Sequence, residues 1–357
     1  MNKLYTLILA GGKGSRLKNL TKNECKAMVK IGGVFHLIDF TLGNCLESGI
    51  IRNIGVVIQH NPNNLLKYLV EWKFNNGIDL DILPPKSSEE YECVKYVDTA
   101  HSVFVNKNII DNYECEDILI LSCDHVYNMD YSKLYKQHKD SGADMTVMVT
   151  QVPLKEASRF GIFSSDENGE LTFEEKPENP KSNLASTGVY IFKKDKLFSF
   201  IEKYIHKKDN NVDFGRDIVP AFLKNHHAEV YVLNNFWKDV GTIESFFKMN
   251  MFILDHDYGK HKAHIFIKSS QQKLPSFYGP KSSVKKSLIN NGNYINGHIN
   301  HSVVGMDNHI EKGANLINAV IMDSCTIKKN VTIKNAIITD DSVIEDDVGN
   351  DDEITLI

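Results

Sequence analysis

The sequence predicts a two-part protein, an α/β domain with a mixed, mostly parallel sheet followed by a short parallel β-helix. Up to about residue 239, short apolar runs alternate with longer segments whose apolar residues have helical spacing. After about residue 280, aliphatic residues recur every five or six positions. The length of 357 residues agrees with two or three domains, because a domain typically has about 100 to 200 residues.

Strands that alternate with helices define the α/β part. The predicted strands are Tyr5–Ala10, Asn53–Ile58, Leu80–Leu83, Asp117–Ser122, Met145–Thr150 and Ser186–Phe192. The predicted helices are Phe40–Ser48, Pro62–Trp72, His101–Asn112 and Tyr131–Ser141. Such sheets bind ligands at the carboxyl ends of their strands, so we expect the functional residues in the loops that follow strands.

The C-terminal repeat predicts a triangular β-helix with three hexads in each coil. Its regularly spaced aliphatic residues are Val304, Ile310, Leu316, Ile321, Ile327, Ile333, Ile338 and Ile344. A longer period of 17 residues repeats Asn318–Asp323 as Asn335–Asp340. An α-helix would need apolar residues at i+3 and i+4, where Asn, Asp and Thr mostly stand. The acidic tail either caps the last coil with charge or is a solvated tail.

Composition excludes several classes of protein. The chain has 41 Lys and Arg against 46 Asp and Glu, so it lacks the basic excess of a protein that binds nucleic acid. No stretch approaches the roughly 18 apolar residues of a membrane-spanning helix, and the N-terminus lacks a signal-peptide cleavage site. Six scattered cysteines without a CxxC pair are typical of reduced thiols, so we expect a cytoplasmic protein.

A change in composition near residue 255 separates the two parts. Residues 255–273 are rich in His, Lys and Gln and have weak periodicity. We therefore expect an α/β domain at residues 1–255, a linker at 256–280 and the β-helix at 281–357. His256, His261 and His264 have loosely metal-like spacing, but no cysteine or acidic cluster completes a metal site there.

A glycine-rich loop after the first strand is the first candidate site. Its three glycines, within residues 11–14, let the backbone turn tightly and present N–H groups to a phosphate, and Lys13 and Arg16 add positive charge. The spacing fits neither a P-loop nor a Rossmann turn, and a purely structural turn is the alternative. Lys26, just downstream, is either a phosphate clamp or a solvated lysine.

Carboxylates supply the other candidates. Asp124 follows an apolar strand, and Asp239 lies in an aromatic setting; two carboxylates and substrate phosphates suit the oxygen preference of Mg²⁺. The alternative for Asp124 is a helix cap. Glu175 and Lys176 precede a proline and either bind a sugar phosphate or form a surface turn. Asp213-Phe214-Gly215 spells a kinase motif, but no HRDxxxxN loop precedes it, so we exclude a kinase.

In this order, the motifs resemble those of the sugar nucleotidyltransferases, in particular the glucose-1-phosphate adenylyltransferases of bacterial glycogen synthesis. The matching segments are GGKGSRLKNLTKN (11–23), GG (32–33), LIDFTLGNCLESGI (37–50), ILSCDHVYNMDYSKL (120–134), EASRFGIF (156–163), EEKPENPKSNLASTGVYIF (174–192), DFGRDIVP (213–220) and WKDVGTIESF (237–246). The resemblance extends essentially from end to end and includes the hexad repeats.

The resemblance implies a Rossmann-like nucleotidyltransferase domain joined to a left-handed β-helix. The implied reaction is ATP + glucose 1-phosphate giving ADP-glucose and pyrophosphate, with Mg²⁺ as the cofactor. It also implies a tetramer, either of identical chains or with a paralogous subunit, and a small-molecule allosteric effector.

Roles for individual residues follow from the same resemblance. Arg16, Lys26 and Asp124 would be catalytic, and Asp124 and Asp239 would hold the metal. The implied nucleotide-binding residues are Gly11, Gly12, Gly14, Ser15 and Thr99. The implied substrate-binding residues are Tyr96, Gly161, Glu175, Lys176, Ser186 and Trp237.

The sequence departs from the family pattern at several positions. Asp98 stands where the family has a glycine near the nucleotide, and we expect its bulk and charge to weaken ATP binding. His101 replaces an Asp, His36 replaces an Arg, and Cys123 replaces a Gly. A weakly catalytic or non-catalytic regulatory subunit is therefore the alternative function, although the charged residues of the expected site are all present.

Overall fold

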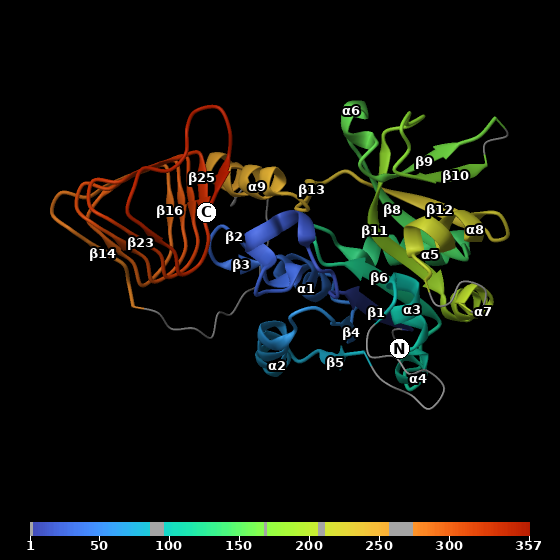
Figure 1. The fold of residues 1–357 in the computed structure, drawn as a ribbon. Coiled ribbons are helices and arrows are strands. Elements are labelled where there is room, and N and C mark those ends of the chain that lie inside the picture. The colour runs from blue at the N-terminus through green and yellow to red at the C-terminus, as the bar shows by residue number, and fades with distance from the viewer. Residues whose placement is uncertain (1–2, 86–95, 168–169, 206–210, 257–273) are drawn as a thin grey trace. The chain divides into compact units, whose positions relative to one another are not determined.

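The computed structural model describes residues 3–85, 96–167, 170–205, 211–256 and 274–357 (Figure 1). The chain forms two compact units, and each of them is discontinuous in sequence. The first unit comprises Met1–Gly12 and Thr41–Trp237, and the second comprises Lys13–Phe40 and Lys238–Ile357. The predicted linker lies mostly outside the described residues, so the predicted boundaries at residues 255 and 281 stay a prediction.

A mixed sheet of nine strands forms the centre of the first unit, in the order β10-β9-β11-β6-β1-β4-β5, with β8 paired to β11 and β12 paired to β8. The strands are β1 (Leu4–Leu9), β4 (Asn53–Val57), β5 (Asp79–Leu83), β6 (Asp117–Ser122), β8 (Met145–Gln151), β9 (Gly161–Ser165), β10 (Leu171–Glu175), β11 (Leu184–Lys193) and β12 (Ala228–Leu233). All six predicted strands are confirmed, with their ends moved by at most two residues. The short strand β7 (His125–Tyr127) follows β6.

Strand β6 lies in the middle of this sheet and positions the residues that follow it. It pairs in parallel with β1, and β11 runs antiparallel on its other side. Ile118, Leu119, Ile120 and Leu121 are all buried, because helices and loops cover both faces of the sheet. This continuous apolar run explains why the strand was recognisable from its sequence.

Helices cover the sheet of the first unit. They are α1 (Leu37–Glu47), α2 (Asn63–Asn76), α3 (Thr99–Phe104), α4 (Lys107–Ile110), α5 (Tyr131–Ser141), α6 (Leu154–Ala157), α7 (Lys194–Ile205), the π-helical turn η3 (Phe214–Ile218) and α8 (Val219–Leu223). The predicted single helix His101–Asn112 is wrong, since Val105 and Asn106 separate α3 from α4. The buried side chain of Asn106 donates to the carbonyl of Ser102 and to the hydroxyl of Tyr96, which stabilises this break.

A parallel β-helix forms most of the second unit, and Figure 1 shows its stacked coils in orange to red. One sheet contains β14 (Phe277–Tyr278), β17 (Tyr294–Ile295), β20 (His309–Ile310), β23 (Thr326–Ile327) and β26 (Val343–Ile344). A second contains β15 (Ser283–Lys285), β18 (His298–Asn300), β21 (Asn315–Ile317) and β24 (Thr332–Lys334). The third contains β16 (Leu288–Ile289), β19 (Val303–Val304), β22 (Val320–Ile321), β25 (Ala336–Ile338) and β27 (Thr355–Leu356).

The strand register confirms the predicted repeat. His309 pairs with Thr326, and Thr326 pairs with Val343, so each of these coils contains 17 residues. One turn near the start of the β-helix is shorter, because Ser283 pairs with His298 and Tyr294 pairs with His309, each fifteen residues later. All eight regularly spaced aliphatic residues lie in the buried core of the β-helix. Strand β27 pairs with β25, so the acidic tail returns to the coil instead of remaining wholly solvated.

An N-terminal segment completes the second unit. It contains the 3-10 helices η1 (Ser15–Thr21) and η2 (Lys26–Met28) and the strands β2 (Lys30–Ile31) and β3 (Phe35–His36). Lys30 forms an ion pair with Asp323, and the amide of Asn290 donates to the carbonyl of Gly32 at 3.1 Å. Helix α9 (Ile243–Asp255) packs on β2, η1 and β19. These contacts explain why residues 13–40 belong to the same unit as the β-helix.

None of the helices in the described part of the chain is long and apolar enough to cross a membrane.

The interior of the β-helix predicts a contrast between two aliphatic positions. Ile327 is fully buried, whereas Val343 is 58% exposed in the same sheet. Ile327→Ala should lower the free energy of unfolding of the β-helix by about 3 kcal/mol, because it leaves a cavity. Val343→Ala should change it by less than about 0.5 kcal/mol. Thermal and urea denaturation measure both values, and equal losses would contradict this packing.

Candidate active site

The glycine loop begins where β1 ends in the first unit. The amide of Ala10 donates to the carbonyl of Val57 at 2.9 Å, which holds the start of the loop beside the end of β4. A Cβ atom at Gly11 would lie 3.4 Å from Cβ of Gln59, whereas one at Gly12 would have no neighbour within 4 Å. The backbone at Gly12 is therefore open to a ligand at the carboxyl end of the sheet.

The second half of the loop belongs to the second unit and needs glycine for a physical reason. Gly14 has φ of +66°, and a Cβ atom there would lie 2.9 Å from Cγ2 of Thr21 and 3.1 Å from Cβ of Lys26. Thr21 also donates its hydroxyl to the carbonyl of Gly14 at 2.9 Å. Lys26 is only 7% exposed, which excludes a solvated lysine. Ser15 and Arg16 are exposed on the surface of η1.

Arg16 and Asp239 approach the same glycine in the second unit. A Cβ atom at Gly241 would lie 3.0 Å from Oδ1 of Asp239 and 3.1 Å from Nη2 of Arg16. Asp239 is the last residue of β13 (Trp237–Asp239), and α9 starts just beyond Gly241 with a capping box between Thr242 and Ser245. The cap therefore fixes the turn that carries Asp239, while Arg16 reaches Gly241 from η1.

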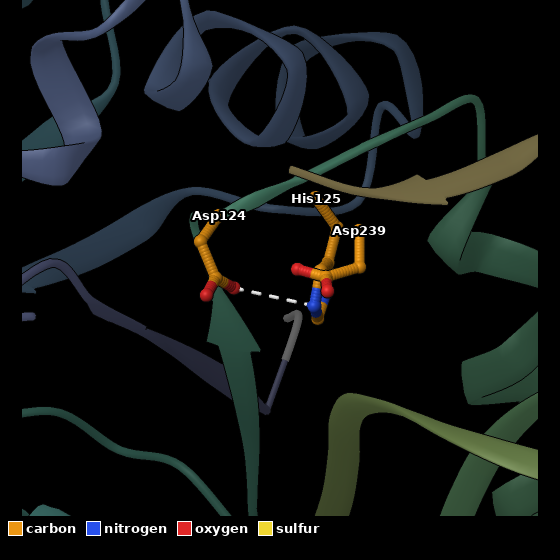
Figure 2. A group of neighbouring side chains, drawn as sticks. All are labelled: Asp124, His125 and Asp239. Atoms are coloured by element: carbon orange, nitrogen blue, oxygen red, sulfur yellow. Dashed lines mark ion pairs between the residues drawn. The ribbon is translucent and has the colours of Figure 1, made fainter. Parts of the chain in front are cut away.

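Asp124 lies just beyond the end of β6 in the first unit. Ser122 donates its hydroxyl to Oδ1 of Asp124, and Nε2 of His125 lies 3.3 Å from the same oxygen (Figure 2). Asp124 does not cap the next helix, because the side chain of Asp130 accepts from the amide of Ser132 at the start of α5. Its side chain is 30% exposed, so the carboxylate remains within reach of a ligand.

Trp237 is buried at the end of the first unit. Its ring lies 4.9 Å from the ring of His125 and 5.5 Å from that of Phe160, between centroids. Only 8% of the residue is exposed, and its Nε1 atom has no hydrogen-bond partner within the described ranges. A buried donor of this kind is stabilised when a ligand supplies an acceptor.

Two glycines hold the carboxylate of Glu175 at the end of β10. A Cβ atom at Gly161 would lie 2.8 Å from its Oε2 atom, and one at Gly215 would lie 2.9 Å from the same oxygen. The Oε1 atom accepts from Nζ of Lys176 at 2.9 Å. Lys176 has φ of +48° and is exposed, so its amine projects from a tight turn. The carboxylate thus approaches the backbone at two points where no other residue type leaves room.

Strand β11 adds two hydroxyl groups to this region. Its register shifts between Ser186 and Val189, and Oγ of Ser186 lies 3.0 Å from Oη of Tyr190. Burial raises the pKa of Tyr190 far above its usual value, and the negative charges of Glu175 and Asp213 raise it further. The phenol therefore stays neutral and can donate a hydrogen bond at physiological pH.

Asp213 is a functional candidate to which the sequence assigned no role, although it lies in the kinase-like motif and in a segment that matches the family. Its Oδ2 atom accepts from the hydroxyl of Thr99 at 2.8 Å, and that hydroxyl accepts from the amide of Phe214 at 3.0 Å. In the kinase-like motif, Asp213 is the N-cap of η3, and Phe214 and Gly215 are the first residues of that turn. The one signal in the sequence was Gly215, two residues after Asp213. A glycine can mark a place where another group approaches the backbone, and here the carboxylate of Glu175 does so.

Tyr96 is buried and contacts the backbone of β5 and the segment after it, and its predicted role in substrate binding stays a prediction. It is 5% exposed, and its hydroxyl lies 2.8 Å from the carbonyl oxygen of Pro84 and 3.1 Å from that of Leu83. Its amide donates to Oε1 of Gln59 at 2.6 Å. These contacts give Tyr96 a role in holding the backbone that leads into α3.

His36 does not supply the charge of the arginine that it replaces. Its Nδ1 atom lies 2.8 Å from the carbonyl oxygen of Met28, so this nitrogen carries the hydrogen. Burial lowers the pKa of His36 to about 4, and the nearby Lys30 acts in the same direction. The imidazole is therefore neutral at physiological pH.

Comparisons with known proteins identify the family of the chain. The chain matches the family model for nucleotidyl transferases over residues 5–256 and a GlmU-like, C-terminal hexapeptide model over residues 275–354. The glucose-1-phosphate adenylyltransferases of Bacillus anthracis and Bacillus thuringiensis subsp. konkukian are 39% identical over 348 residues, covering 92% of this chain and 89% of each relative. That of Bacillus mycoides is 39% identical over 342 residues, with the same coverage of 92% and 89%. The chain therefore belongs to the nucleotidyl transferase family and, within it, to that of the glucose-1-phosphate adenylyltransferases.

Proposed function

We propose that this protein transfers the adenylyl group of ATP to glucose 1-phosphate, giving ADP-glucose and pyrophosphate for glycogen synthesis. The observation that carries the proposal is the carboxylate of Glu175 held between Gly161 and Gly215 and paired with Lys176. This group offers hydrogen-bond acceptors for sugar hydroxyls beside a cation for a phosphate. The relatives at 39% identity are named glucose-1-phosphate adenylyltransferases, after this activity.

In this reaction, an oxygen of the sugar phosphate attacks the α-phosphorus of ATP in line with the departing pyrophosphate. The protein forms no covalent bond to either substrate. Its task is to hold two anions that repel each other and to neutralise the charge that develops during transfer. Positioning and electrostatic stabilisation therefore account for the catalysis.

The sugar phosphate interacts with the first unit in this proposal. Lys176 pairs with the phosphate, and the carboxylates of Glu175 and Asp213 accept from sugar hydroxyls. Tyr190 donates its phenolic hydrogen, because its raised pKa keeps the group neutral. Trp237 contributes the buried Nε1 donor that lacks a protein partner within the described ranges.

The triphosphate interacts with the glycine loop. The open backbone at Gly12 presents N–H groups to phosphate oxygens. Arg16 is exposed and acts on the leaving pyrophosphate, while the buried Lys26 lies against Gly14 and supports the loop. The family resemblance implies catalytic roles for both Arg16 and Lys26, and the approach of Lys26 to Gly14 supports its place beside the loop.

Mg²⁺ fits the donor set of this chain. Asp124 and Asp239 provide hard carboxylate oxygens, and neither lies in the core where a bare charge would be costly. When bound, the ion would neutralise phosphate charge and orient the triphosphate. Asp124 would hold it at the end of β6, with Ser122 donating to the carboxylate and keeping its orientation.

Replacing Asp124 tests the metal-binding carboxylate. Asp124→Asn should lower the rate of pyrophosphate release at least roughly a hundredfold, because charge stabilisation at the phosphates is lost. Chelation with EDTA should abolish the wild-type rate, and excess Mg²⁺ should restore it. Asp140→Asn is the matched control. The side chain of Asp140 is 62% exposed and pairs with Lys136 on the same helix, so this substitution should leave the rate unchanged. Wild-type protein that folds but releases no pyrophosphate, alone or with a paralogous subunit, would contradict the proposed function.

Two adjacent glutamates allow a test of the sugar subsite. Glu175→Gln should raise the KM for glucose 1-phosphate roughly tenfold, since a charged acceptor is lost. The KM for ATP should change much less. Glu174→Gln removes the neighbouring carboxylate, which lies 3.8 Å from Lys181, and should change neither the KM for glucose 1-phosphate nor the KM for ATP. Steady-state kinetics with each substrate varied in turn measures the difference, and equal effects of the two variants would refute the assignment of Glu175.

Assembly, regulation and location extend this proposal. We infer a tetramer, so light scattering should give a mass four times the 40.5 kDa of one chain. A small-molecule effector should change the rate of pyrophosphate release. A cytoplasmic location is supported by the five described cysteines, which are all buried thiols without a disulfide bond.

A further inference from the structure

Three carboxylates crowd the start of α3 and the start of η3 in the first unit. Asp98 is the N-cap of α3, Asp213 is the N-cap of η3, and Asp217 lies in the first turn of η3. The side chain of Asp217 is 4% exposed and that of Asp98 is 23% exposed. Burial raises the pKa of Asp98, and the charge of Asp213 adds to this increase. The two segments would repel each other without a compensating cation.

Arg216 is a cation that connects them. Its Nη2 atom lies 3.2 Å from Oδ2 of Asp98 and 2.8 Å from Oδ2 of Asp217, and its Nε atom donates to the same oxygen of Asp217 at 2.9 Å. Its backbone amide donates to Oδ1 of Asp213 at 2.9 Å. The planar guanidinium can donate to both carboxylates at once, which a lysine ammonium on a flexible stem does less well.

The two segments that Arg216 connects also hold the sugar subsite. Thr99, the first residue of α3, donates its hydroxyl to Asp213 at 2.8 Å. Gly215, the neighbour of Arg216, is the residue whose missing Cβ leaves room for the carboxylate of Glu175. A change in the separation of α3 and η3 would therefore move Asp213 and Gly215 relative to Glu175.

We propose that the ion pair between Arg216 and Asp98 positions Asp213 and Glu175 for the sugar ring, and thereby sets the affinity for the sugar phosphate. Both residues are positioning residues, since each acts through its neighbours. The identity of the substrate in this inference rests on the proposed function. Asp98, which the sequence suggested as an obstacle to ATP, has its carboxylate engaged by the amide of Thr99 and by Arg216.

The substitution Asp98→Asn separates the charge of this residue from its capping role. Asn is as good an N-cap as Asp, so its side-chain oxygen can still accept from the amide of Thr99. Only the ion pair to Arg216 is then lost. Arg216→Ala removes the same ion pair and also the contacts of Arg216 with Asp217, whereas Arg216→Lys retains one positive charge without the planar fork.

Steady-state kinetics and calorimetry test the inference. Asp98→Asn and Arg216→Ala should each raise the KM and the Kd for glucose 1-phosphate roughly tenfold. The KM for ATP should stay within about twofold of the wild-type value, and Arg216→Lys should recover part of the affinity. The double variant should be about as impaired as either single variant, because the two residues act through one contact.

A structural role alone would give a different result. Asp98→Asn leaves the contacts of Arg216 with the buried Asp217 intact, and the side chain of Arg216 is 52% exposed, so the loss of this one ion pair should lower the melting temperature only slightly. Lys136→Ala breaks another exposed ion pair, with Asp140, and should change neither the melting temperature appreciably nor any kinetic constant. An unchanged Kd for the sugar phosphate, an equal rise in the KM for ATP, or additive effects in the double variant would overturn the inference.

The proposed function can fail separately from this inference. Wild-type protein without turnover would contradict the adenylyl transfer, while calorimetric titration with glucose 1-phosphate would still compare the variants. Wild-type protein that does not bind glucose 1-phosphate would overturn both.

Discussion

Missing Cβ atoms bring charged side chains of each unit into contact with that unit's own backbone. Gly161 and Gly215 leave room for the carboxylate of Glu175, and Gly241 does so for Asp239 and Arg16. At Gly14, φ is positive and the aliphatic part of Lys26 fills the space. A methyl group at any of these positions would displace a charged side chain or its support. The helices and strands bring these charged side chains near each other. The glycines then determine how closely each side chain approaches the backbone.

Local charge balance is the second requirement of this protein. The chain has a net charge of −5, so it does not attract two anionic substrates through its overall field. In the proposed sugar subsite, the carboxylates of Glu175 and Asp213 would accept from sugar hydroxyls, but their charge would oppose the binding of a phosphate. Lys176 offsets the charge of Glu175 at 2.9 Å, where screening by salt is weak, and Asp213 accepts from the backbone amide of Arg216 at 2.9 Å. Binding therefore depends on a few cations at defined positions.

The second unit shows how a repeat domain integrates a distant segment. The coils of the β-helix repeat every 17 residues where hexads of aliphatic residues fill the core, and the sequence predicts this directly. The contacts of Lys30 with Asp323 and of Gly32 with Asn290 have no such periodic signal, because they join positions more than 250 residues apart. As a result, the loop residues Ser15 and Arg16 fold with the β-helix and α9.

The sequence by itself determined the strands, the hexad core, the glycine loop and the acids at strand ends, since buried strands and repeats have continuous local patterns. The tertiary structure decided questions that the spacing of residues in the sequence left open. Lys26 is buried, Asp124 is not a helix cap, and the hydroxyl of Tyr96 contacts the carbonyl of Pro84. It also revealed Asp213 and the pairing of Asp98 with Arg216, whose partners are more than 110 residues away. Such contacts depend on how segments that are distant in the sequence pack together. They produce no periodic pattern of residues, so the sequence alone does not predict them.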